Sequence, residues 1–164
     1  MNISDKLLKE NIYKLKNTVL TGSTNNIKWR LNQINKVSKL LDENKKEIIK
    51  SLFIDLGKSE IESLSEILLI KQEISLINKK LKSWMQPKKI NTPFYLFPSS
   101  SKVIYEPLGC VLILAPYNYP LLYVFKPLVN IFSAGNTALI KPSEKCTSTS
   151  KLIKKLTSKY FDNN

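Results

Sequence analysis

Two apolar runs near the end of the chain, separated by a stretch of helical length, constrain the fold most. Residues 110–115 are continuously apolar, as in a parallel strand covered on both faces, and residues 138–140 form a shorter run of this kind. Residues 121–132 between them suit a crossover helix, and Gly135-Asn136 supply a stop and return turn. The pattern predicts a βαβ unit whose two strands end at the same edge of a parallel sheet.

Apolar residues upstream of this unit recur at helical spacing. We expect one helix before the turn-rich segment 21–26, and a second, continuous helix from residue 31 to a stop at Gly57. From Ser59 to Trp84 the apolar residues follow steps of three and four. This seam favours a helix packed on a neighbour in the same domain over a free coiled coil, which would sustain the repeat for longer.

Prolines at positions 87, 93 and 98 exclude further helix after this seam. Residues 94–97 and 103–105 are predicted to be short extended segments around a serine turn, forming a β-ribbon. An isolated ribbon is only marginally stable in water, so we expect it to pair with a partner chain or with other residues of its own polypeptide.

The predicted fold class is therefore α/β, in three consecutive parts. Residues 1–86 form N-terminal helices, residues 87–105 form a ribbon of the oligomerisation type, and residues 106–164 begin a Rossmann-like βαβ sheet. A sheet that stops after one such unit has an open edge, for which we expect aggregation, oligomerisation or partial order.

The formal net charge of +13 raises the question of nucleic-acid binding. Arg30 is the only arginine, whereas phosphate and base readers favour planar guanidinium forks. The lysines are spread over every helical segment, which indicates a solvated basic surface. We therefore expect no nucleic-acid partner, and a basic nucleic-acid binder is the least favoured function.

The cysteines also narrow the chemistry. Cys110 and Cys146 show no metal-ligand spacing, and the chain has no histidine, so zinc sites, Ser-His triads and Cys-His pairs are excluded. Cys110 is expected to be a small buried hydrophobe. Cys146 follows Lys145 near a helix start, a setting that can lower a thiol pKa, yet no base is near it in the sequence.

Neither a secretory signal nor a transmembrane segment is expected. Residues 1–10 are mixed in charge and lack a continuous apolar stretch. The most apolar region, residues 108–134, is interrupted by polar residues and three prolines, unlike the ~20 apolar residues that a spanning helix requires. A cytoplasmic location is the resulting expectation.

Three polar residues follow the predicted strands, where open α/β sheets bind ligands. Asn118 follows the first strand and can donate a hydrogen bond to developing negative charge, although taken alone it is more simply interpreted as a helix cap or turn residue. Lys141 and Glu144 follow the second strand and suit a ribose, or else a solvated turn. Neither a Gly-x-Gly-x-x-Gly nor a Walker sequence is present to strengthen the nucleotide hypothesis.

Four motifs in a fixed order resemble the NAD(P)-dependent aldehyde dehydrogenase superfamily, and most closely its class 3, fatty-aldehyde type. They are Glu106-Pro107-Leu108-Gly109, Pro116-Tyr117-Asn118-Tyr119-Pro120, Ala134-Gly135-Asn136 and Lys141-Pro142-Ser143-Glu144. The upstream segment Asp55-Leu56-Gly57-Lys58 and the helix after it fit the same family, so the resemblance covers residues 25–164.

The resemblance implies a role for each site residue. Asn118 matches the asparagine whose amide holds the aldehyde oxygen as it becomes an oxyanion. Lys141 and Glu144 match the pair that binds the adenosine ribose of NAD or NADP, and Glu144 disfavours a 2′-phosphate by charge repulsion. The nicotinamide ribose side is lined by the strand end at Ala115, Pro116 and Tyr117, where tyrosine replaces the commoner tryptophan. The ribbon resembles the family's oligomerisation strands.

The family's Gly-rich cofactor turn, glutamate base and catalytic cysteine lie downstream of the matched motifs. The resemblance thus implies an N-terminal portion of an enzyme that oxidises an aldehyde to a carboxylate, inactive on its own. A complementing downstream fragment or a homo-oligomer is the expected partner. The alternative is a catalytically dead module or relic that docks on an intact homologue. A split gene, a frameshifted relic and a functional fragment all remain open, as do the aldehyde and the choice between NAD and NADP.

Overall fold

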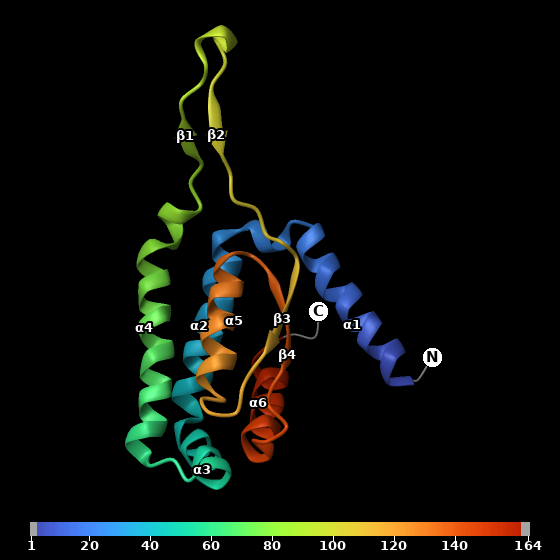
Figure 1. Ribbon diagram of the computed structural model, residues 1–164, viewed down its shortest axis with the longest axis vertical. Coiled ribbons are helices and arrows are strands. Elements are labelled where there is room, and N and C mark those ends of the chain that lie inside the picture. Colours follow the sequence, from blue (N-terminus) through green and yellow to red (C-terminus); the bar gives the residue numbers. More distant parts are fainter. Residues whose placement is uncertain (1–2, 162–164) are drawn as a thin grey trace.

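Four helices make up the first half of the chain. The computed structural model describes residues 3–161; positions 1–2 and 162–164 of the predicted first and last parts lie outside the described residues. The helices are α1 (Ile3–Leu20), α2 (Ile27–Glu43), α3 (Lys45–Leu56) and α4 (Glu60–Trp84), with a 3₁₀ turn, η1 (Ser23–Asn25), after α1. Figure 1 shows α1 apart from α2 and α4, which run antiparallel to each other.

The prediction of one continuous helix from residue 31 to Gly57 is wrong, because the chain bends at Asn44 between α2 and α3. The Asn44 side chain donates to the Leu40 carbonyl at 2.8 Å and to the Tyr160 hydroxyl at 3.0 Å. Apolar periodicity did not detect the bend, because α2 and α3 both turn their apolar residues toward one core.

The next two helix boundaries are those that the sequence predicts. Gly57 ends α3 with a left-handed φ of 64°, a conformation that only glycine adopts cheaply. Ser59 and Glu62 then form a reciprocal capping box at the start of α4.

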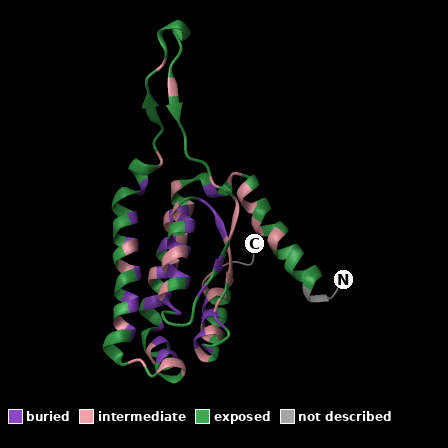
Figure 2. Cartoon of the chain, viewed as in Figure 1, coloured by how far each residue is buried: buried purple, intermediate pink, exposed green. Residues whose placement is uncertain are grey.

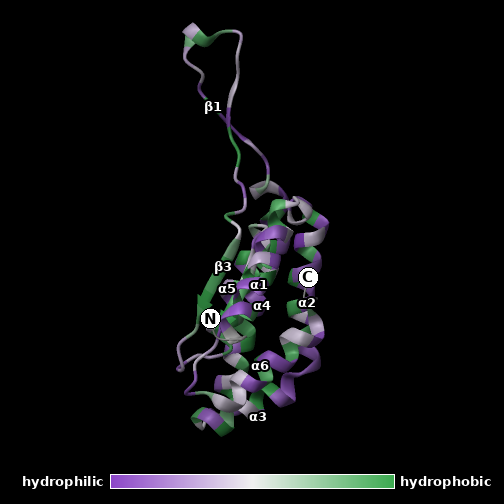
Figure 3. Cartoon of the chain, turned by 90° about the vertical axis from the view of Figure 1, so that its right-hand side faces the viewer, coloured by the Kyte–Doolittle hydropathy of each residue, from purple (hydrophilic) through white to green (hydrophobic). Residues whose placement is uncertain are grey.

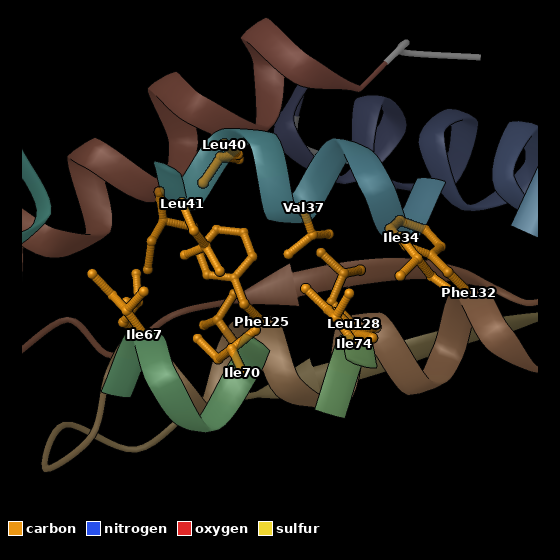
Figure 4. Packing of buried hydrophobic residues seen from close by; sticks show 14 of the residues in the cluster. Ile34, Val37, Leu40, Leu41, Ile67, Ile70, Ile74, Phe125, Leu128 and Phe132 are labelled. Carbon is orange, nitrogen blue, oxygen red and sulfur yellow. The ribbon is translucent and has the colours of Figure 1, made fainter. Parts of the chain in front are cut away.

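The core lies where α2, α4 and α5 (Leu122–Ser133) meet (Figure 4). The seam of α4 faces this core, which confirms the prediction of a helix packed within its own domain. The central residues are Ile34, Val37, Leu40 and Leu41 of α2, Ile67, Ile70 and Ile74 of α4, and Phe125, Leu128 and Phe132 of α5. Ile153 and Leu156 of α6 (Thr147–Tyr160) extend the same cluster.

The βαβ unit is present as predicted. Strands β3 (Cys110–Leu114) and β4 (Thr137–Lys141) pair in parallel, with α5 as the crossover between them and α6 after them. The register places Leu114 beside Lys141, and the Ala115 N–H donates to the Lys141 carbonyl at 3.1 Å. Both strands therefore end together, and residues 115–118 and 141–144 emerge at the same edge of the sheet (Figure 1).

The two faces of β3 are covered unequally within residues 3–161. Ile113 is buried in the core, whereas Leu112 and Leu114, on the opposite face, are 55% and 67% exposed. Figure 3 shows β3 as a hydrophobic strand at the margin of the molecule. The expectation of cover on both faces is not met among residues 3–161. An apolar run indicates that a strand is suited to burial, but it does not show which segment covers the strand. The predicted open sheet edge is confirmed by a described sheet of two strands.

The ribbon exists, but its strands differ from the prediction. Strand β1 (Lys88–Ile90) pairs antiparallel with β2 (Ser101–Val103), and η2 (Phe94–Leu96) forms the tip. The prediction of a strand at 94–97 is wrong. Pro93 and Pro98 flank that segment and lack the N–H groups that a continuous ladder needs. Figure 2 shows nearly the whole ribbon exposed, including Phe94 and Phe97 at 91% and 86%.

The single arginine is used inside the fold. The buried Arg30 guanidinium donates from Nε to the Thr24 carbonyl at 3.0 Å and from Nη1 to the Ser133 carbonyl at 2.9 Å, at the C-terminus of α5. Arg30 thereby joins η1 to α5. This placement removes the one guanidinium from the surface that a nucleic acid would contact.

Gly135→Ala is expected to lower the free energy of unfolding by about 2–5 kcal/mol, combining a left-handed backbone with overpacking. Gly135 has a φ of 79°, and a Cβ there would lie 2.5 Å from Nη2 of the pinned Arg30. Gly57→Ala is the matched control, because its φ of 64° is similar but nothing lies within 4 Å. Urea unfolding of both variants measures the difference, and equal losses would contradict the role of Arg30.

Among residues 3–161, no helix combines the length and apolar character needed to cross a lipid bilayer.

Candidate functional site

The two loops that carry the predicted site residues are joined directly at the carboxyl edge of the sheet. Besides the bond between Ala115 and Lys141, the Cys146 thiol donates to the Tyr117 carbonyl, with 3.3 Å between Sγ and O. The Lys145 ammonium lies 4.9 Å from the centre of the Tyr117 ring. The structure thus brings the segment preceding Asn118 against the segment following Glu144.

Asn118 is exposed, and its side chain has no hydrogen-bond partner within residues 3–161. Leu121 occupies the N-cap position of α5, so Asn118 does not cap this helix, whereas the alternative prediction of a turn residue is confirmed by the bend at this position. The side-chain amide therefore remains available to a ligand.

Glu66 of α4 is the residue that caps α5. Its Oε2 accepts from the N–H groups of Leu121 at 3.1 Å and Leu122 at 2.8 Å, and the residue is 0% exposed. Sequence reasoning missed this role. The available signal was a carboxylate on the buried face of the α4 seam, since a buried charge requires a partner.

Lys58 supplies that partner. Its ammonium forms a salt bridge with Oε1 of Glu66, and only 12% of the Lys58 side chain is exposed. The same ammonium lies 4.0 Å from the centre of the Tyr119 ring, next to Asn118 in the sequence. The motif at residues 55–58 thus holds the loop that carries Asn118.

Asp55, in the same motif, caps α6. Its two carboxylate oxygens accept from the N–H groups of Ser148 at 3.0 Å and Thr149 at 2.7 Å. Carboxylates from outside the βαβ unit therefore occupy the N-termini of both α5 and α6. Because these N–H groups are already bonded, neither helix end offers the usual anion site to a cofactor phosphate.

Lys141 and Glu144 form an ion pair at the end of β4, with 2.5 Å between Nζ and Oε2. The hydrogen bond from Lys141 is the main cause that lowers the pKa of the Glu144 carboxyl below its usual value. Both side chains are more than half exposed, so ligand hydroxyl groups can reach an ammonium donor and a carboxylate acceptor together.

Cys146 is not a nucleophile in this arrangement. Burial, followed by the charges of Asp55 and Glu66, raises the pKa of the thiol, and Lys58 only partly opposes them. The predicted helix-start setting does not lower this pKa, because Asp55 already occupies the N–H groups of α6.

A groove of about 1270 Å³ opens at the other end of the sheet. Arg30, Trp84, Leu108, Gly109 and Asn136 contribute to its lining. Gly109 and Asn136 precede β3 and β4, so this groove is separate from the edge that carries Asn118 and Lys141.

Comparison with known proteins identifies the family of this chain. The sequence profile described as "Aldehyde dehydrogenase family" matches residues 14–160. The chain belongs to the aldehyde dehydrogenase family. It is 40% identical over 159 residues to the 4,4'-diaponeurosporen-aldehyde dehydrogenase of Staphylococcus aureus, covering 96% of this chain and 35% of that protein. It is 38% identical over 151 residues to aldehyde dehydrogenase family 3 member I1, chloroplastic, of Arabidopsis thaliana, covering 92% and 28%.

Solved aldehyde dehydrogenase structures share the fold. The substrate-bound state of Staphylococcus aureus AldH superposes with a TM-score of 0.92 at 39% identity, covering 99% of this chain and 35% of that one. Succinic semialdehyde dehydrogenase from Streptococcus pyogenes, in complex with NADP+ as the cofactor, gives 0.80 at 16% identity, covering 98% and 34%, and supports the fold alone.

These comparisons confirm the resemblance to class 3 aldehyde dehydrogenases and the mixed α/β fold class. The chain spans about a third of the length of the relatives it matches. The roles of Ala115, Pro116, Tyr117, Asn118, Lys141 and Glu144, and the division at residues 86 and 105, stay predictions.

Proposed function

We propose that this chain supplies the oxyanion-binding amide and the adenosine-ribose site of an NAD(P)-dependent aldehyde dehydrogenase that oxidises an aldehyde to a carboxylate. One observation carries the proposal. In this chain, which belongs to the family, the Asn118 side-chain amide without a hydrogen-bond partner lies at the same edge of the sheet as the Lys141–Glu144 pair. The relatives' names support an aldehyde as the substrate class.

Each group has a defined task in this proposal. The Asn118 Nδ2 group donates to the aldehyde oxygen as negative charge develops there. Lys141 donates to ribose hydroxyls, and the Glu144 carboxylate accepts from them. Ala115, Pro116 and Tyr117 line the nicotinamide ribose side. When bound, the cofactor accepts the hydride.

The donor set fits an adenosine ribose better than a phosphate. An exposed ammonium and a carboxylate match the donors and acceptors of a diol, whereas Asp55 and Glu66 occupy the N-termini of α6 and α5. The negative charge of Glu144 favours NAD over NADP by repelling a 2′-phosphate.

The nucleophile and the general base are proposed to come from sequence outside these 164 residues. The raised pKa of Cys146 supports this division, because a protonated buried thiol is a poor nucleophile. We expect the isolated chain to show no aldehyde-dependent reduction of NAD or NADP.

The proposed partners are a complementing polypeptide or further copies of the chain. Exposed Phe94 and Phe97 on the ribbon and the uncovered Leu112 and Leu114 on β3 support association. A cytoplasmic location is also proposed, since Cys110 and Cys146 are both free thiols. The second candidate function, a dead module docking on an intact homologue, is favoured by the same exposed surfaces.

Reconstitution tests the proposal. The chain is co-expressed with the remaining two thirds of the Staphylococcus aureus relative, and reduced cofactor is measured with an aldehyde substrate. We expect activity from the pair and none from either part alone. Activity of the isolated chain would overturn the division of labour, and a stable but inactive pair would favour the docking module.

Lys141→Ala is expected to raise the dissociation constant for NAD by about tenfold or more, because hydrogen bonds to charged groups contribute about 1.5–3 kcal/mol. Calorimetric titration of the chain with NAD measures this change. Lys154→Ala is the control, since it removes the same charge from an exposed position on α6. Equal effects of the two substitutions would indicate a general charge effect, and undetectable binding at millimolar NAD would leave the relic or docking hypotheses.

A further inference from the structure

The loop that carries Asn118 is fixed by its neighbours, whereas the Asn118 side chain itself is free. The Tyr117 carbonyl accepts from the Cys146 thiol, and the Tyr119 ring lies under the Lys58 ammonium. Pro116 and Pro120 restrict the backbone on both sides. Anchors therefore surround Asn118 without consuming the amide that a ligand would use.

One of these anchors, Lys58, and the start of α5 both converge on Glu66. Its Oε2 holds the first N–H groups of α5, at Leu121 and Leu122, and its Oε1 holds Lys58, which covers Tyr119. Glu66 lies on α4 inside the core between Ser63 and Ile67, so it offers a fixed point that the loop lacks on its own. Removing Glu66 therefore releases the start of α5 and leaves Lys58 without its carboxylate partner.

We infer that Glu66, together with Lys58, is a positioning residue that fixes the Asn118 amide for the oxyanion. The inference rests on the proposed function of Asn118. Reactive geometry tolerates little displacement, because a misplacement of about 1 Å can cost about 100-fold in rate. An ion pair with a fully buried carboxylate, which connects α4, the loop and α5, supplies the required rigidity.

Asp55 offers a built-in comparison. It caps α6 as Glu66 caps α5, through two backbone N–H groups at similar distances, and its hydrogen bonds go to α6 rather than to the loop at 116–120. A substitution at Asp55 therefore removes an equivalent helix cap but reaches the Asn118 loop only through Cys146, and it leaves Lys58, Tyr119 and the start of α5 in place.

Pulsed electron paramagnetic resonance tests the inference on the full chain. Nitroxide labels are attached to Asn118→Cys and to Lys80→Cys on α4, in a Cys110→Ala background, with unlabelled chain added to suppress intermolecular signals. Cys146 is 0% exposed, so its thiol is shielded from the labelling reagent, and the Cys110→Ala chain treated with the reagent is the control. Circular dichroism confirms that each variant retains its helices.

We expect Glu66→Ala to broaden the distance distribution about twofold, and Asp55→Ala to broaden it clearly less. If Glu66→Ala does not fold, Glu66→Gln is measured instead. The neutral amide of this variant cannot form an ion pair with Lys58, so we expect a distance distribution of intermediate width. An unchanged width in a folded Glu66 variant, or equal broadening by Asp55→Ala, would overturn the inference. Neither result depends on cofactor or turnover, so the proposed function can fail or stand separately.

Discussion

Replacing Asn118 by alanine is expected to lower kcat of the reconstituted dehydrogenase by about 10²–10³, the usual effect of removing one oxyanion donor. The side chain has no other hydrogen-bond partner among the described residues, so the loss falls on the ligand interaction and not on the fold. Because the bond strengthens as the oxygen becomes charged, the KM for the aldehyde should change little.

Two further variants sharpen this test. Asn118→Asp keeps the shape but places a negative charge next to the developing oxyanion, so it should be at least as severe as alanine. Asn130→Ala on α5 is the control, because its exposed amide bonds only to the Lys126 carbonyl within its own helix. Steady-state kinetics of the three variants decide the role. A kcat for Asn118→Ala within about twofold of the parent would exclude Asn118 as an oxyanion donor.

Glu66→Ala is expected to lower the free energy of unfolding by about 3–5 kcal/mol, as for other broken buried ion pairs. The substitution strands the Lys58 ammonium at a site where 12% of its side chain is exposed, and it leaves two N–H groups of α5 without an acceptor. Urea unfolding followed by circular dichroism measures the loss.

A double-mutant cycle separates the two causes. Glu66→Ala combined with Lys58→Met removes the stranded cation but still leaves the α5 N–H groups unpaired, so we expect only part of the stability to return. Asp42→Ala is the control, because it breaks the exposed Asp42–Lys71 pair and should cost at most about 1 kcal/mol. A loss of that size for Glu66→Ala would contradict a structural role for the buried pair.

Short-range patterns predicted most of the helices and the βαβ unit. The Gly57 stop, the Ser59 cap and the apolar run at 110–115 each act within a few residues, so their signals are visible in the sequence. The same reasoning missed the bend at Asn44, because helices on either side of it face one core. It also misplaced the ribbon strands, where prolines exclude a ladder at 94–97.

Some features of the candidate site were likewise predicted from the sequence, and others were not. Parallel pairing of two predicted strands was sufficient to place Asn118 and the Lys141–Glu144 pair at one edge. The cap on α5, the cap on α6 and the cation over Tyr119 were not predicted. Each joins the segment at residues 55–66 to residues between 119 and 149, and no local pattern reports such a contact.

The amino-acid sequence by itself determined the family, the βαβ unit and the polar residues at the ends of its strands, because these depend on local periodicity and on motif order. Only the tertiary structure decided that Asn118 is free while Glu66 caps α5, and that Cys146 is buried with a raised thiol pKa. The physical reason is that the use of a buried charge is set by the partners that folding brings to it. The free energy needed to desolvate the Glu66 carboxylate is offset because Lys58 and two backbone N–H groups form bonds with it in the core.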